Sequence, residues 1–117
     1  MNWMMFAVPV STLLVMIVTS LAALSKLPKG ARLPMQWGVG GKPTWFASRG
    51  VALGFTPVLA GLVFAVLIAP EVVAGEDALK PALSASLNFV AGVLVVVHLV
   101  HIWFAIRHVK RQSSGRV

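Results

Sequence analysis

The chain has 117 residues, of which 58% are hydrophobic and only 11% are charged. A typical soluble domain carries about 25% charged residues, so this composition excludes an ordinary soluble domain and indicates a protein of the lipid bilayer. There is no cysteine, which excludes disulfide bonds and gives no indication of the redox compartment.

Three apolar runs are long enough to cross a bilayer, because about 20 helical residues span a hydrocarbon core of about 30 Å. For the first run a signal peptide is the alternative, but no basic segment precedes the run and no clear cleavage site follows it, so we expect an uncleaved helix. The sequence predicts an all-α membrane protein with three transmembrane helices. We expect one membrane domain over 1–117, made of helix 1 at about 3–24, a Trp/Gly/Pro-rich interfacial loop at 25–50, helix 2 at about 51–69, a loop at 70–81, helix 3 at about 82–106 and a basic tail at 107–117.

The charged residues are divided between the two sides of the predicted spans. With three crossings, the first loop and the tail share one side, which holds nine of the ten basic residues, and all three acids lie on the other. This is the positive-inside pattern, so we expect the N-terminus outside and the 25–50 loop and the C-terminus in the cytoplasm. Topology or contact with acidic lipid accounts for the net charge of +7; nucleic-acid binding is not expected, since no recognition helix or stacking platform is evident. The nine basic residues are Lys26, Lys29, Arg32, Lys42, Arg49, Arg107, Lys110, Arg111 and Arg116, and the acids are Glu71, Glu76 and Asp77.

The first loop combines helix-breaking residues with aromatic ones. Trp37, Trp45 and Phe46 prefer the headgroup region, so we expect this loop to lie along the membrane interface. The glycines before Lys42 resemble a phosphate-binding loop, but they run into Pro43 instead of a helix, so a nucleotide site is not expected.

The same loop resembles a known family. Leu33-Pro34-Met35-Gln36-Trp37, Gly41-Lys42-Pro43, Trp45 and Ala47-Ser48-Arg49 are similar to the signature of the bacterial domain of unknown function 1648, which also heads the immunity proteins against the sporulation-delaying toxin. Many members have His, Asn and Asp where this chain has Gln36, Gly38 and Thr44, and the immunity proteins have additional spans. The resemblance implies a membrane domain and, by analogy, toxin immunity. The motif residues are Pro34, Gln36, Trp37, Gly41, Pro43, Trp45 and Arg49.

Three histidines, His98, His101 and His108, fall within an arc of about 80° on helix 3. Such a stripe could carry protons, ligate a haem or bind a metal. The sequence offers no opposing histidine for haem, and the acids are predicted on the far side of the membrane, which disfavours a metal site or a Ser-His-Asp relay. The histidines are therefore expected either to make helix contacts or to form a stripe that a partner completes.

Small residues recur at helical spacing, which lets helix backbones approach closely in lipid. We expect these positions to pack helices, either within the chain or against another subunit. Pro57 is expected to give helix 2 a hinge or a static kink. The candidate packing residues are Gly50, Gly54, Gly61 and Ala65 in helix 2 and Asn88 and Gly92 in helix 3.

No catalytic, cofactor or metal site is expected. With the resemblance to a bacterial domain, the leading hypothesis is a small non-enzymatic multi-pass protein of the bacterial inner membrane. We expect it to act through helix–helix interaction, as an accessory subunit or regulator of a larger membrane complex. The alternatives are a homo-oligomeric proton or ion transport protein that uses His98 and His101, and a toxin-immunity protein by family analogy. Expected partners are membrane lipids and other membrane subunits or copies of the chain itself, with no nucleic acid and no identified small-molecule substrate.

Overall fold

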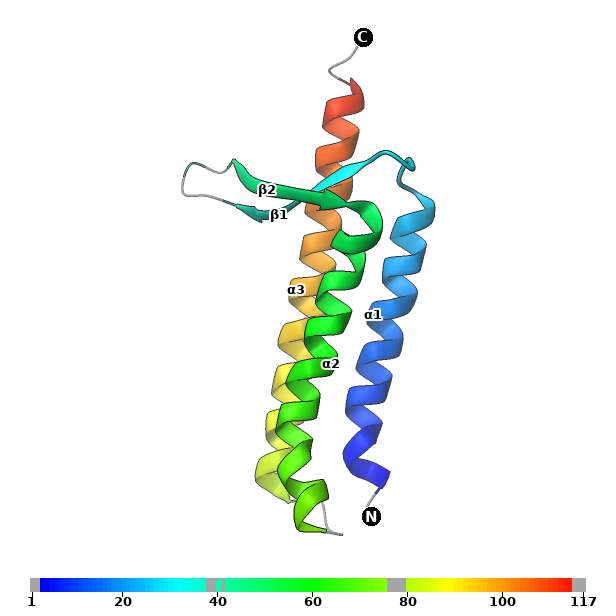
Figure 1. The fold of residues 1–117 in the computed structure, drawn as a ribbon. Coiled ribbons are helices and arrows are strands. Elements are labelled where there is room, and N and C mark those ends of the chain that lie inside the picture. Colours follow the sequence, from blue (N-terminus) through cyan, green and yellow to red (C-terminus); the bar gives the residue numbers. More distant parts are fainter. Residues whose placement is uncertain (1–2, 38–39, 41, 76–79, 115–117) are drawn as a thin grey trace.

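Three helices and a β-hairpin make up the computed structural model, which describes residues 3–37, 40, 42–75 and 80–114. The helices lie side by side, and the molecule is 60 Å long and 30 Å by 18 Å across (Figure 1). All three helices are long and apolar enough to cross a membrane, which confirms the predicted fold of a multi-pass, all-α membrane protein. In chain order the elements are η1 (Trp3–Phe6), α1 (Ala7–Ser25), β1 (Arg32–Trp37), β2 (Pro43–Ser48), α2 (Arg49–Ala74) and α3 (Pro81–Ser114).

Helix α2 is longer than the predicted run of 51–69. It begins at Arg49 and continues through both Pro57 and Pro70. Each proline removes one backbone N–H from the helix, but in a membrane the flanking turns and neighbouring helices support such a break. The helix ends at Gly75, whose φ of +69° places it in the left-handed region, where its N–H bonds to the Val72 carbonyl at 3.1 Å. Glycine adopts this conformation without steric cost, which is why the helix stops there and not at Pro70.

Helix α3 also exceeds its predicted span of 82–106, because it continues to Ser114. The basic tail predicted at 107–117 is therefore helical as far as the structure describes it. The extension projects past the hairpin at one end of the molecule (Figure 1).

Residues 25–50, predicted only as an interfacial loop, contain an antiparallel two-stranded hairpin. Leu33 pairs with Ala47 and Arg32 with Ser48, and the register is interrupted near Pro34 and again before Trp37. Such irregularities bend and twist a hairpin. The hairpin runs crosswise to the helices at the end of the bundle that also holds the C-terminus (Figure 1).

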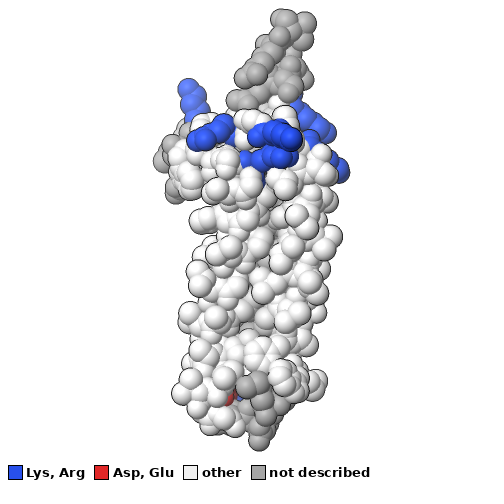
Figure 2. Space-filling view, turned by 45° about the vertical axis from the view of Figure 1, so that its right-hand side comes forward, with Lys and Arg blue, Asp and Glu red and all other residues white. Residues whose placement is uncertain are grey.

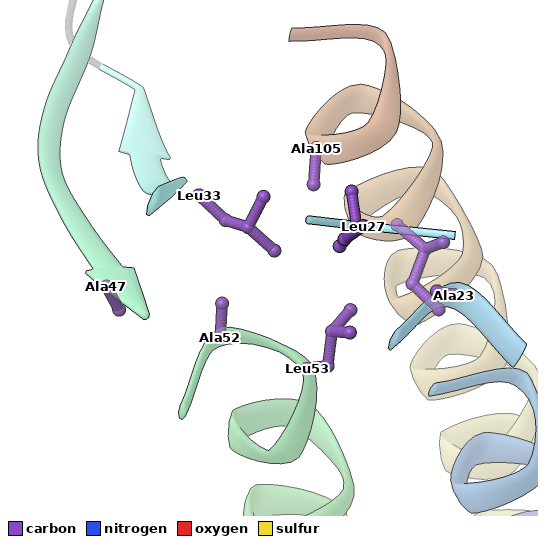
Figure 3. Close-up of a cluster of buried hydrophobic side chains, with 8 residues drawn as sticks. Ala23, Leu27, Leu33, Ala47, Ala52, Leu53 and Ala105 are labelled. Carbon is purple, nitrogen blue, oxygen red and sulfur yellow. The ribbon is translucent and has the colours of Figure 1, made fainter. Parts of the chain in front are cut away.

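The base of the hairpin packs on all three helices in one hydrophobic cluster. Leu33 has no exposed surface and reaches from β1 into the space between the helices (Figure 3). Its neighbours in the cluster include Leu27 and Leu53 near the ends of α1 and α2 and Ala105 of α3. The hairpin therefore closes one end of the bundle. A second cluster, nearer the N-terminus, is made of Met5, Met16, Ala60, Phe64, Ile68, Leu87 and Ala91.

Candidate functional site

A group of polar side chains lies inside the bundle around His98 of α3, of which only 1% is exposed. Its Nε2 atom lies 3.0 Å from the Met16 carbonyl oxygen, 3.1 Å from Thr19 Oγ1 and 3.2 Å from Ser20 Oγ, all on α1. The Ser20 hydroxyl also lies 2.8 Å from the carbonyl oxygen of Leu53 on α2. One polar group thus joins all three helices, and we call it the His98 cluster.

The direction of these bonds follows from the carbonyl groups, which can only accept. Nε2 of His98 donates toward the Met16 carbonyl, and the Ser20 hydroxyl donates to the Leu53 carbonyl. Nε2 carries a single hydrogen, so the oxygens of Thr19 and Ser20 share this N–H with the Met16 carbonyl. The neutral imidazole with its proton on Nε2 fits this arrangement, and an interhelical hydrogen bond in a membrane contributes about 0.6 to 2 kcal/mol.

The other two predicted stripe residues do not join this cluster. His101 is half-buried, and the ring of His108 lies 5.7 Å from the ring of Phe46 on β2, at the hairpin. Ten residues of helix separate His98 from His108, which corresponds to about 15 Å. Within the described part of the chain, no three His, Cys, Asp or Glu side chains gather as a metal site would require.

The family-motif residues occupy the hairpin and the start of α2. Pro34 is fully buried at the hairpin base, whereas Trp45 is 44% exposed. Gln36, Trp37 and Pro43 belong to the two strands, and Gly41 lies outside the described residues. The described motif residues thus belong to the hairpin that caps the bundle and to the start of α2.

Arg49, the last motif residue, has a clear structural contact. Its Nη1 atom donates to the carbonyl oxygens of Leu24 and Leu27, each at 3.0 Å. Leu24 is in the last turn of α1 and Leu27 follows just after it, where backbone oxygens lack partners within the helix and the helix dipole is negative. Arg49 therefore joins the start of α2 to the end of α1.

The four predicted packing residues of α2 are not buried against the chain's own helices. A Cβ atom built at Gly50, Gly54 or Gly61 meets nothing within 4 Å, and Ala65 is exposed. The three glycines line an apolar groove of about 430 Å³ between α1 and α2. The buried face of α2 is instead formed by Ala52, Leu53, Thr56, Ala60, Phe64 and Ile68.

Asn88 and Gly92 of α3 are also on the outer surface. Asn88 is exposed, and its amide makes no hydrogen bond with another described residue. Ser86, nearby on the same helix, has its hydroxyl bonded to the Ala82 carbonyl at 2.9 Å. A Cβ at Gly92 would again meet open space. Asn88 is thus a polar side chain that faces outward with its hydrogen-bonding groups unsatisfied by the described chain.

Charge is divided between the two ends of the molecule. Lys and Arg side chains gather around the hairpin end, and the long middle carries none on the face that Figure 2 shows. At the opposite end Glu71 of α2 lies 3.5 Å from the Lys80 ammonium, just before α3. Glu76 and Asp77, predicted at this end, lie outside the described residues. An uncharged middle between charged ends is the surface that a membrane requires.

No protein-family model, no curated protein and no solved structure matches this chain. The resemblance of the loop to the domain of unknown function 1648 stays a prediction from its residues.

Proposed function

We propose that this chain is a non-enzymatic protein of the bacterial inner membrane that acts by association with another membrane protein, as an accessory subunit or regulator. The observation that supports the proposal is the exposed amide of Asn88, which lies about two helical turns after the start of α3 at Pro81. An amide that faces hydrocarbon without a partner is costly, because no water is available to satisfy it.

The surroundings of Asn88 fit a helix of another chain. Ala85 and Gly92 lie one turn to either side, so a second helix can approach the α3 backbone closely at this point. Close approach allows an amide to bond across the contact, as polar residues do between membrane helices. This outward face of α3, made of Ala85, Asn88 and Gly92, is called the Asn88 face below.

The two alternative functions have less support from the geometry. A transport path lined by the third helices of several subunits needs His98 on an outer surface, but its ring is buried and contacts α1. Toxin immunity rests on the loop motif alone. Both stay predictions that flux measurements in liposomes and protection of a sensitive cell would test.

Copurification tests the association. We expect the tagged chain, extracted in mild detergent, to retain a membrane-protein partner, and we expect Asn88→Leu to lose most of it, since one interhelical bond of about 1 to 2 kcal/mol corresponds to roughly 5- to 30-fold in affinity. Ser86→Ala is the matched control, because its hydroxyl is already bonded within α3. Two differently tagged copies distinguish self-association from another subunit. A wild-type chain that always elutes alone would refute the proposal.

The proposed orientation places the hairpin and the C-terminus in the cytoplasm and the N-terminus outside. The chain has no cysteine, so a single introduced thiol reports its own location. In intact cells Thr44→Cys in β2 should resist an impermeant thiol reagent, and Ala74→Cys at the other end of α2 should react. Permeabilised cells should label both variants. Prompt labelling of Thr44→Cys in intact cells would reverse the orientation.

A further inference from the structure

The groove between α1 and α2 is separate from the Asn88 face. Its α1 wall includes Leu13, Ile17 and Leu24, and its α2 wall includes Gly50, Gly54 and Gly61. The one hydroxyl in its lining belongs to Ser20, which is already bonded to the Leu53 carbonyl. The groove is therefore apolar, and it is open toward the surrounding lipid.

The length of the groove matches half of a bilayer. From Leu13 to Leu24, and equally from Gly50 to Gly61, a helix rises by about 16 Å. One leaflet contributes about 15 Å of a hydrocarbon core of about 30 Å. A second helix is about 10 Å wide and would lie over the groove without filling it. A single acyl chain of the adjacent leaflet fits both the length and the narrow section.

The chemistry at the end of the groove indicates the headgroup. Leu24 and Gly50 end the groove at the hairpin, where the basic residues gather (Figure 2). Lys26 is exposed two residues beyond Leu24, and Arg49 immediately precedes Gly50. Among the described residues, no acid lies at this end. An anion here meets at least two cations.

Arg49 is already positioned for such an anion. Both of its bonds, to the Leu24 and Leu27 carbonyls, use Nη1, so Nε and Nη2 have no partner among the described residues. A guanidinium fixed on one side can present its remaining N–H groups to a phosphate with little loss of side-chain freedom. The first turn of α2, which no Ser48 side-chain bond caps, adds positive potential at the same place.

We propose that the groove binds one acyl chain of an anionic glycerophospholipid from the adjacent leaflet, with the lipid phosphate held at Arg49 and Lys26. The lipid fills the space that the three glycines leave open. This site is independent of the proposed association, which uses α3.

Native mass spectrometry of the delipidated full chain in mild detergent tests the site, with dioleoylphosphatidylglycerol and dioleoylphosphatidylcholine as probes. We expect one phosphatidylglycerol to be retained in preference to phosphatidylcholine. Lys26→Gln should weaken phosphatidylglycerol binding about fivefold, the effect of one cation near a charged headgroup. Lys42→Gln, which removes the same charge from the hairpin, should leave binding unchanged. Equal retention of the two lipids, or equal effects of the two substitutions, would refute the headgroup assignment.

Larger side chains in the groove test whether an acyl chain binds there. Gly54→Leu and Gly61→Leu should each lower retention of phosphatidylglycerol at least about tenfold, since the added side chain occupies the space of the lipid. Gly92→Leu on α3 makes the same change outside the groove and should retain the lipid. Two groove positions are tested because, if one variant fails to fold, the other variant still tests the site. Lipid retention by folded Gly54→Leu or Gly61→Leu would refute the site, as would a dimer that these substitutions abolish.

Discussion

His98→Ala should destabilise the protein by about 2–4 kcal/mol, because it leaves a cavity in the bundle and removes the side chain that joins α3 to α1. The free energy of unfolding can be measured by titration of the detergent-solubilised chain with a denaturing detergent, with tryptophan fluorescence as the signal. The expected loss is large because the imidazole is almost fully buried.

Two further substitutions separate packing from hydrogen bonding. His98→Leu keeps most of the volume, so it should cost about 1 kcal/mol, the value of the interhelical bond. His101→Ala, at the half-buried neighbour on the same face, should cost less than about 1 kcal/mol. Equal losses at positions 98 and 101 would contradict the assigned role of the His98 cluster. A role in proton transport would instead show as loss of flux in liposomes with stability unchanged.

The helices could be predicted because their signal is local. Hydropathy over about 20 residues identified all three spans, and neither Pro57 nor Pro70 breaks α2. In a soluble protein a proline often ends a helix, and the predicted end of helix 2 at residue 69, just before Pro70, is too early for this reason. The signal that decides the end is Gly75, the residue that adopts the left-handed conformation.

The hairpin was harder to predict because its strands are short and contain prolines. Pro34 and Pro43 lower the β-propensity of segments that a two-residue alternation would otherwise identify: Leu33, Met35 and Trp37 in β1 have that spacing. The hairpin is held by packing on the bundle, through Leu33 and its cluster (Figure 3), and a propensity argument cannot register such contacts.

The candidate sites show which information a single sequence lacks. The spacing of the three histidines predicts that they share one face of α3. It does not predict whether this face packs against the other helices or faces the lipid. Ser20 and His98 are 78 residues apart, so their contact depends on how two helices are rotated against each other. In the same way, spacing identified the small residues of α2 without showing that they line an outer groove.

Arg49→Met should destabilise the protein by about 1.5–3 kcal/mol, the usual range for hydrogen bonds to a charged group. The substitution removes the donor to the Leu24 and Leu27 carbonyls and the positive charge at the negative end of α1. The same unfolding titration measures the loss. Proteolysis should cut the connection between α1 and β1 faster in the variant, because that connection no longer has the hydrogen bond between the Leu27 carbonyl and Arg49 of α2.

Arg32→Met is the matched control at the same end of the molecule. Arg32 is exposed and makes one long bond of 3.4 Å to the Phe46 carbonyl, so its loss should change the unfolding free energy by less than about 0.5 kcal/mol. Both titrations belong in a detergent without anionic lipid, where a bound phosphate cannot add to the effect of Arg49. If Arg49→Met is as stable as the wild type under these conditions, the bonds of Arg49 to the Leu24 and Leu27 carbonyls do not stabilise the fold. The role of Arg49 would then be limited to binding the lipid phosphate.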